Sequence, residues 1–304
     1  YPRGDMAKEA RWLLVWDAFK ARNDAEVVRL AKAGEAATRD DPDFASRFCY
    51  WHARALDRAG QSKEALARWS ACARDYPMMF YGFMALNRLK DARRTSPGRI
   101  LRELTVGSSH APFLTLSRAE VLDSGPVARA RWLAQTGLPG LAADELSKVD
   151  ERDPDAGWVA AMLLDAGNHH RRSHRMAKNL LRRQGAGWPT NDTAGYFRLA
   201  YPRPYAEAVA MASRESGVSS HLIYGVMREE SAFVAGIESH ANAMGLMQLI
   251  LPTAKAMGRK LGLKATPETL RHPEVNVRLG ASFLSDLLKR FKEPLLAIPG
   301  YNAG

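Results

Sequence analysis

The apolar residues of this chain follow a helical spacing almost throughout and show almost none of the alternation that β-strands require. In residues 1–185, Ala, Leu, Arg and Trp recur about every three to four positions, which places them on one face of a helix. Runs in which β-branched residues alternate with polar ones are nearly absent. A chain with this pattern buries its apolar side chains by packing helix against helix, so we predict an all-α fold.

A loose repeat divides the first part of the chain into helical hairpins. In each copy a glycine follows small and apolar residues; the copies lie at residues 55–66, 132–146 and 163–167. A glycine just past the last helical residue is typical of a helix C-terminus, so each copy predicts a helix, a turn and a second helix. Stacked hairpins form a solenoid, and residues 1–185 are therefore predicted to be an α-superhelical domain. Five tryptophans are expected in the hairpin core rather than on a ligand-binding surface: Trp12, Trp16, Trp51, Trp69 and Trp132.

The helical pattern breaks in residues 186–204, where Gly, Pro, Asn and Asp cluster. Such a cluster indicates a domain junction. Helical spacing resumes in residues 205–304 without a convincing series of strands. We therefore predict a second helical domain over residues 205–304.

Composition limits the classes of partner. The 304 residues suffice for about two domains, and 46% of them are hydrophobic, which is enough to build a core. The net charge of +11 favours an anionic partner such as nucleic acid, anionic lipid or an acidic cell-wall polymer, and is equally consistent with a merely solubilising surface. No run approaches the ~18 continuous apolar residues of a membrane-spanning helix, so no integral membrane segment is expected.

The two cysteines, Cys49 and Cys72, flank the predicted turn at Gly60 at similar distances. In an antiparallel helical hairpin they would lie at a similar height. A disulfide bond between them is geometrically reasonable and would require an oxidising compartment. Two small buried thiols explain the same pattern.

Two adjacent carboxylates occur in MREESAF, residues 227–233. With about 100° per residue from Leu222, an apolar stripe is centred near 70°, while Glu229 falls near 340° and Glu230 near 80°. The residues of this stripe are Leu222, Ile223, Val226, Met227 and Phe233. Glu229 therefore lies where water reaches it, whereas Glu230 projects into apolar surroundings. Burial raises the pKa of a carboxyl group, so Glu230 is either a candidate general acid or a buried carboxylate satisfied by Arg or backbone donors.

Four motifs follow Glu229 in a characteristic order. They are ESAF at 230–233, SHANAMGLMQL at 239–249, NVRLG at 276–280 and GYNAG at 300–304. Together they resemble the catalytic domain of family 1 soluble lytic transglycosylases. The segment LAYPRPY at 199–205 is similar to the family's entry into that domain.

This resemblance implies a lysozyme-like fold for the catalytic domain. The N-terminal part of the chain resembles the family only in its architecture. The soluble members of the family carry a long α-superhelical domain ahead of the catalytic one. DYPMMFYGFMALNRL, residues 75–89, resembles a segment of that domain. The family normally has further helices after the last motif, so the catalytic domain is expected to be C-terminally incomplete at Gly304.

The resemblance also assigns site residues. Glu230 matches the single catalytic acid/base, and Ser239 and Gln248 match positions that line the glycan groove. Tyr301 matches a tyrosine that orients the catalytic carboxyl by hydrogen bonding, and Asn302 belongs to the same motif.

The chain departs from the family pattern at three places. Asn242 stands where the family usually has Gly, which Asn replaces mildly because it tolerates a left-handed conformation. Ile250 stands where a groove methionine is usual, and Pro299-Gly300 replaces the usual Ala-Ala before Tyr301. These departures affect the details of the subsites rather than the reaction.

The implied activity is cleavage of the β-1,4 bond between N-acetylmuramic acid and N-acetylglucosamine without hydrolysis, leaving 1,6-anhydro ends. Two-carboxylate glycosidases need a second Asp or Glu. Residues 239–267 contain neither, and Glu238 is the nearest candidate. This absence favours a one-carboxylate mechanism. A muramidase with Glu238 as base, and a non-catalytic helical scaffold that binds nucleic acid, are the alternatives.

The reaction that the resemblance implies requires no metal or cofactor. His240 beside the groove motif has no second ligand at a suitable spacing, so it is not expected to bind a metal. Peptidoglycan glycan strands are the expected partner, and other cell-wall enzymes are further candidates. Nucleic acid is not an expected partner. The carboxylates of peptidoglycan suit the basic charge. Peptidoglycan as substrate implies the bacterial periplasm. The start YPRGDMAKEA has no signal-peptide apolar region, so a signal peptide is expected to have been removed.

Overall fold

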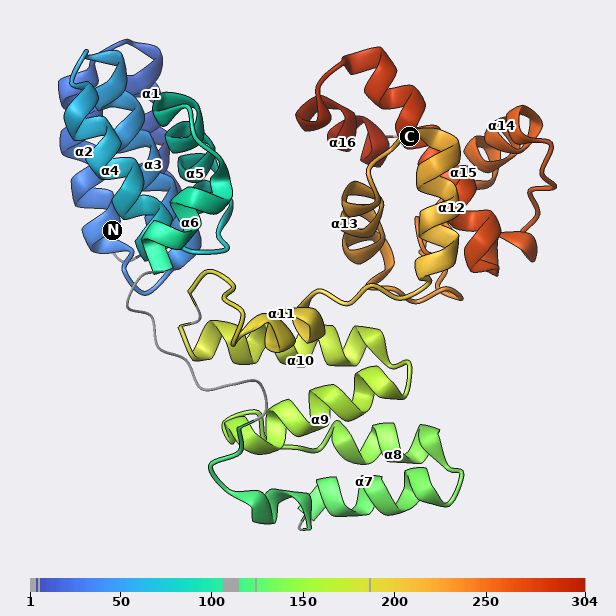
Figure 1. Ribbon diagram of the computed structural model, residues 1–304. Coiled ribbons are helices and arrows are strands. Elements are labelled where there is room, and N and C mark those ends of the chain that lie inside the picture. The colour runs from blue at the N-terminus through green and yellow to red at the C-terminus, as the bar shows by residue number, and fades with distance from the viewer. Residues whose placement is uncertain (1–3, 5, 106–114, 124, 186, 304) are drawn as a thin grey trace. The chain divides into compact units, whose positions relative to one another are not determined.

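A computed structural model describes residues 4, 6–105, 115–123, 125–185 and 187–303. Its regular elements are helices, which confirms the all-α fold class, and isolated bridges at 238–249 are the only extended pairings in the described ranges. By contacts the chain divides into two compact units (Figure 1): residues 1–111 with 185–193, and residues 112–184 with 194–304.

The first unit contains six helices among its described residues. They are α1 (Ala7–Lys20), α2 (Asp24–Ala37), α3 (Pro42–Arg58), α4 (Ser62–Asp75), α5 (Phe80–Arg93) and α6 (Pro97–Thr105). Consecutive helices from α1 to α5 pack against each other, as hairpins require (Figure 1). Asn23 and Asp41 cap α2 and α3 by accepting hydrogen bonds from backbone N–H groups in the first turn.

A disulfide bond joins Cys49 on α3 to Cys72 on α4, with the two Cα atoms 5.8 Å apart. Of the two sequence-based alternatives, the structure therefore shows the cross-link rather than free thiols. Both residues are fully buried in the core of this helical hairpin.

In the first two predicted hairpins, a glycine lies in the turn between the two helices. Gly60 and Gly137 adopt positive φ values of 78° and 81°, each two residues past the end of its helix, α3 and α7 (Gly125–Gln135) respectively. In the third copy Gly167 has φ −84°, and the left-handed residue is Asn168, at φ 63°. Asn reaches this conformation more easily than other non-glycine residues, so the chain turns one position later than predicted.

The tryptophan prediction holds for four residues and is wrong for one. Trp69 is buried, and Trp12, Trp16 and Trp51 are partly buried in a cluster with ring centroids 5.1–5.9 Å apart. Trp132 on α7 is 62% exposed. Helical spacing identifies which residues share a face, but it does not show whether a neighbouring helix covers that face.

The predicted junction, residues 186–204, is split between the two units. The reason is Trp188, whose indole N–H donates to the Ala73 carbonyl at 2.7 Å and whose ring packs on Phe83. A buried tryptophan thus attaches residues 185–193 to the first unit, although their composition resembles a linker. The three-part division into 1–185, 186–204 and 205–304 stays a prediction about domains.

The second unit begins with further short helices. They are η1 (Ala119–Leu122), α7 (Gly125–Gln135), α8 (Pro139–Leu146), α9 (Pro154–Ala166), α10 (His170–Arg183) and α11 (Ala194–Ala200). The remaining elements hold the motif residues: α12 (Ala206–Ser216), α13 (Ser220–Ser231), α14 (Leu251–Leu261), η2 (Thr269–Arg271), α15 (Pro273–Phe291) and α16 (Pro294–Ala303).

Helix α15 organises the motif-bearing part of this unit. It is the longest helix there, and α12, α14 and α16 all pack against it (Figure 1). Its buried face joins one apolar core with the buried face of α13 and with the loop 234–250. In the described part of the chain, no helix is long and apolar enough to cross a membrane.

Candidate active site

The two adjacent carboxylates lie at the C-terminal end of α13 in different surroundings. Glu229 is exposed and forms an ion pair with Arg228 at 2.7 Å. Glu230 is partly buried, and this desolvation raises its pKa, with a further contribution from the negative charge of Glu229. The asymmetry derived from helix geometry is therefore present in the folded chain.

The backbone turns sharply directly after Glu230. Ala232 and Phe233 have positive φ values of 46° and 68°, a conformation that costs non-glycine residues about 1–2 kcal/mol each. Ser231 stabilises this turn. Its hydroxyl donates to the carbonyls of Met227 and Leu246, at 3.0 and 2.9 Å, and accepts the Phe233 N–H at 3.1 Å. Ser231 thus ties the helix end that carries Glu230 to the loop 234–250.

Asn276 holds the other side of this loop. Its side chain has no exposed surface, and Oδ1 accepts the Met247 backbone N–H at 2.8 Å. Its Nδ2 donates to the carbonyls of Met244 and Leu270, both at 2.9 Å. Sequence reasoning placed Asn276 in a motif but gave it no role. Its signal was a polar residue at an apolar position of a long amphipathic helix.

Two glycines allow this close approach. A Cβ atom on Gly245, at φ 77°, would lie 2.2 Å from Asn276 Nδ2 and 2.3 Å from the Leu270 carbonyl oxygen. A Cβ atom on Gly280, one turn after Asn276 on α15, would lie 2.5 Å from the Met247 sulfur. Gly245 therefore leaves room for the Asn276 side chain and the Leu270 backbone, and Gly280 leaves room for the Met247 side chain.

The predicted groove residues Ser239 and Gln248 both bond to the loop itself. The Ser239 hydroxyl accepts the backbone N–H groups of Ala241 and Ala243 at 3.3 and 3.1 Å. The Gln248 amide donates to the carbonyls of Ile237 and Gly245 at 3.3 and 2.9 Å. Both side chains are only partly buried, so each can still present polar atoms outward.

Ile250 and Asn242 line an open cavity of about 550 Å³, together with Glu238 and Pro267. Ile250 is 37% exposed, an unusual position for a large apolar side chain. Asn242 has φ 57°, the left-handed conformation expected where the family usually has Gly. The cavity combines an apolar wall with polar edges, a combination common in ligand sites.

Tyr301 is almost fully buried beneath the loop. Its hydroxyl donates to the Met247 carbonyl at 2.8 Å, so a hydrogen bond with Glu230 would need the carboxylic acid as its donor. Burial raises the pKa of Tyr301, and the charge of Glu230 raises it further. Asn302, next in the motif, is exposed.

Glu238, the candidate second carboxylate, forms an ion pair with Arg271 at 2.8 Å. This pairing holds its charge at the rim of the cavity. Among the described residues, no group of three or more His, Cys, Asp or Glu side chains could hold a metal ion.

Comparison with known proteins connects these motifs to a family. The sequence profile of the transglycosylase SLT domain matches residues 207–304. Membrane-bound lytic murein transglycosylase C of Mannheimia succiniciproducens is 41% identical over 85 residues, which are 27% of this chain and 24% of that protein. The chain spans only 19% to 24% of the length of the first curated relatives that it matches.

Solved structures extend the likeness to most of the chain. The inactive glutamate-to-glutamine mutant of lytic transglycosylase Slt from Pseudomonas aeruginosa is 27% identical, with a TM-score of 0.62 over 92% of this chain and 44% of that one. The 70-kDa soluble lytic transglycosylase from Escherichia coli is 18% identical, with a TM-score of 0.62 over 91% of this chain and 41% of that one; at this identity it supports the fold alone.

These matches confirm the predicted fold class, a helical-hairpin domain ahead of a lysozyme-like domain. All four motifs lie within residues 207–304, the range that the domain profile matches. Residues 207–304 therefore match the transglycosylase SLT domain family, and the resemblance of the chain to family 1 soluble lytic transglycosylases is confirmed.

Proposed function

We propose that this chain is a lytic transglycosylase that cleaves peptidoglycan glycan strands between N-acetylmuramic acid and N-acetylglucosamine. The observation that carries the proposal is the difference between the two carboxylates of α13. Glu230 is partly buried with a raised pKa, whereas Glu229 is exposed and paired with Arg228. A carboxylic acid that keeps its proton near neutral pH is suited to protonate a glycosidic oxygen.

In the proposed reaction Glu230 acts first as acid and then as base. Its proton passes to the glycosidic oxygen, the bond from that oxygen to C1 of the muramic acid breaks, and positive charge develops at C1. The Glu230 carboxylate then removes the proton of the C6 hydroxyl, and the C6 oxygen bonds to C1. Glu230 ends protonated again, no water is consumed, and the product is a 1,6-anhydro sugar.

Several residues support this assignment by position. Ser231 and Asn276 fix the loop beside Glu230 through buried hydrogen bonds. Ser239, Gln248, Ile250 and Asn302 are proposed to contact the glycan, and Tyr301 to accept a hydrogen bond from protonated Glu230. The Pseudomonas enzyme is inactive when one glutamate is replaced by glutamine, which supports an essential glutamate in the proposed reaction.

The proposed setting is the bacterial periplasm, where peptidoglycan lies. The Cys49–Cys72 disulfide bond supports an oxidising compartment. A strand that carries carboxylates is also a suitable partner for a chain of net charge +11.

The test is mass spectrometry of the fragments released from purified peptidoglycan by the parent chain, Glu230→Gln and Glu229→Gln. We expect anhydro-muropeptides from the parent and from Glu229→Gln, the matched control one residue away, and none from Glu230→Gln. Products heavier by one water would make the chain a muramidase and direct attention to Glu238. Equal products from Glu230→Gln would remove Glu230 from its proposed role.

A further inference from the structure

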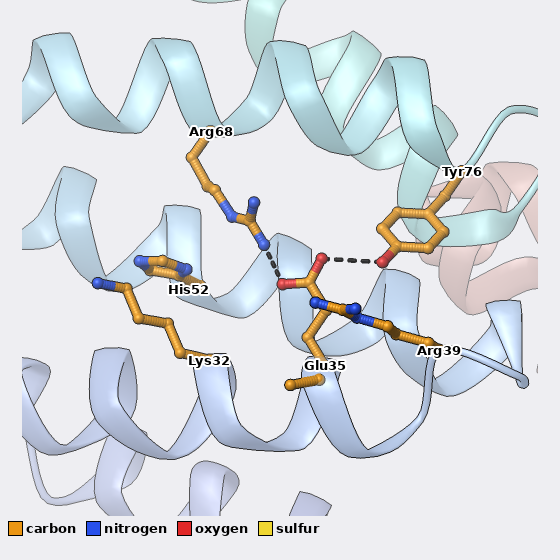
Figure 2. Close-up of a pocket in the computed structure, with 7 residues that line it drawn as sticks. Lys32, Glu35, Arg39, His52, Arg68 and Tyr76 are labelled. Carbon is orange, nitrogen blue, oxygen red and sulfur yellow. Dashed lines mark hydrogen bonds and ion pairs between the residues drawn. The ribbon is translucent and has the colours of Figure 1, made fainter.

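A second cavity lies in the first unit, formed by different residues from those of the candidate active site. It has a volume of about 310 Å³ and is lined by residues of α2, α3 and α4, by Arg39, which follows α2, and by Tyr76, which follows α4. Figure 2 shows its side chains gathered around a central carboxylate, that of Glu35. The cavity is within the size range of small-ligand sites.

Helix α2 and the turn that follows it contribute the charged wall. Lys32 and Glu35 lie on α2, and Arg39 lies two residues past the last helical residue, Ala37. Lys32 and Arg39 are exposed, and neither has a hydrogen-bond or ion-pair partner within the described residues. Two unpaired cations thus border the cavity, one on α2 and one in the turn that follows it.

The single carboxylate of the cavity is already satisfied. Glu35 Oε2 is paired with the Arg68 guanidinium, and Oε1 accepts the Tyr76 hydroxyl at 2.8 Å (Figure 2). Burial and this hydrogen bond raise the pKa of Tyr76, so it remains a donor. Glu35 therefore positions Arg68 and Tyr76, and the charge of Lys32 and Arg39 is left without a counterion.

Two buried polar atoms of the lining also lack partners. His52 is only 6% exposed, and its Nδ1 has no hydrogen bond; the same holds for Nε of Arg68. Burial, with the charges of Arg68 and Lys32, lowers the pKa of His52 to about 4, so the ring is neutral at pH 7. Buried polar groups are usually hydrogen-bonded in folded proteins, so these two atoms can bond to a ligand in the cavity.

We propose that this cavity binds a small organic ligand with two separated carboxylate groups. Lys32 and Arg39 each receive one carboxylate, and the polar edge of His52 and Arg68 lines the space between them. Figure 2 shows Lys32 to one side of Glu35 and Arg39 to the other, and this separation suits an extended dianion better than a compact one such as phosphate. This proposed ligand binding is independent of the proposed catalytic reaction.

The disulfide bond reinforces this pocket. Cys49 lies one turn before His52 on α3, and Cys72 lies one turn after Arg68 on α4. The bond therefore fixes the two walls that face α2. Reduction is expected to weaken ligand binding without altering any lining side chain.

The test is isothermal titration calorimetry of the full chain at low salt, with adipate as the extended dicarboxylate and with acetate and inorganic phosphate in parallel. We expect one adipate per chain and weaker binding of the other two anions. The variant Lys32→Gln/Arg39→Gln should weaken adipate binding by about tenfold or more, because it removes both charge-assisted contacts. Lys63→Gln, an exposed charge on α4 outside the cavity, serves as the control for net charge.

Three results would overturn the proposal: no adipate binding, equal binding by the double variant and the parent, or equal weakening by Lys63→Gln. Phosphate that binds more tightly than adipate, and depends on Lys32 and Arg39, would overturn the dicarboxylate assignment in favour of a compact anion. Because both substituted side chains are exposed, the double variant is expected to melt at the same temperature as the parent, which circular dichroism checks.

Discussion

Asn276 and Met247 are joined by a buried hydrogen bond in which the Met247 backbone N–H donates to the Asn276 side-chain oxygen over 2.8 Å. The same amide donates to two carbonyls, at Met244 and Leu270. One side chain without exposed surface therefore satisfies three backbone groups around the loop beside Glu230. The position of this loop depends on helix α15 as much as on its own sequence.

Replacing Asn276 by Leu should destabilise the chain by about 3 kcal/mol or more, because three buried backbone groups lose their partners at about 1–3 kcal/mol each. Urea unfolding measures the loss. Asn302→Leu, at an exposed position of the same unit, is the matched control and should change stability by less than about 0.5 kcal/mol. Similar losses in the two variants would contradict the proposed clamp.

Gly245→Ala should cost more than Gly262→Ala, although both glycines have positive φ. At Gly262 a Cβ atom meets nothing within 4 Å, so only the left-handed conformation is penalised, by about 1–2 kcal/mol. At Gly245 the new atom also collides with Asn276 and Leu270, which adds about 1–3 kcal/mol. Paired thermal melts of the two variants compare these costs, and equal melting temperatures would count against the close approach.

Replacing both Cys49 and Cys72 by Ser should lower the free energy of unfolding by about 3 kcal/mol, from the loss of loop-closure constraint in the unfolded chain. The bond closes a loop with a sequence separation of 23 residues, within the first unit. Unfolding of the parent with and without reductant gives the same comparison without mutation. The double Ser variant, unlike the parent, should not respond to reductant.

Glu229→Gln should shift the alkaline limb of the pH–activity profile to lower pH. The charge of Glu229 raises the pKa of Glu230, so its removal lowers that pKa and Glu230 loses its proton earlier as pH rises. The measurement is the rate at which the parent and Glu229→Gln release soluble fragments from peptidoglycan across a range of pH. An unchanged limb would show that a group other than Glu230 sets it.

Glu230→Gln should stabilise the fold near neutral pH. Because the folded-state pKa of Glu230 is raised above its ordinary 4.5, the ionised carboxylate is disfavoured in the folded chain relative to the unfolded one. That penalty is absent below the unfolded pKa, where the group is neutral in both states, and it appears as pH rises through the folded pKa. Melting temperatures of variant and parent should therefore diverge with rising pH and converge in acid.

Much of the fold could be predicted from the sequence because helical spacing and turn glycines are local signals. The α3–α4 hairpin with Gly60 at its turn follows from them directly. The same periodicity separated Glu229 from Glu230, because the angle between two residues on a helix is fixed by geometry. Trp132 shows the limit: its face could be identified, but no local signal shows whether another helix covers it.

Long-range contacts explain the remaining differences. The Tyr301 hydroxyl donates to the Met247 carbonyl, 54 residues away, and the role of Asn276 depends on a loop 29 residues earlier. Trp188 joins a linker-like segment to Ala73 across 115 residues. Composition and spacing describe the surroundings of a residue only within a few helical turns, so such pairings appear only in the folded chain.

The turn at Ala232 and Phe233 has an electrostatic consequence for the residue before it. By ending α13 at Ser231, it leaves Glu230 in the last helical turn, where aligned peptide dipoles amount to about half a negative charge. This partial charge disfavours an anion there and favours retention of the carboxyl proton. Since this partial charge arises from the backbone, its share of the raised pKa of Glu230 should remain in Glu229→Gln, where only the share from the neighbouring carboxylate is lost.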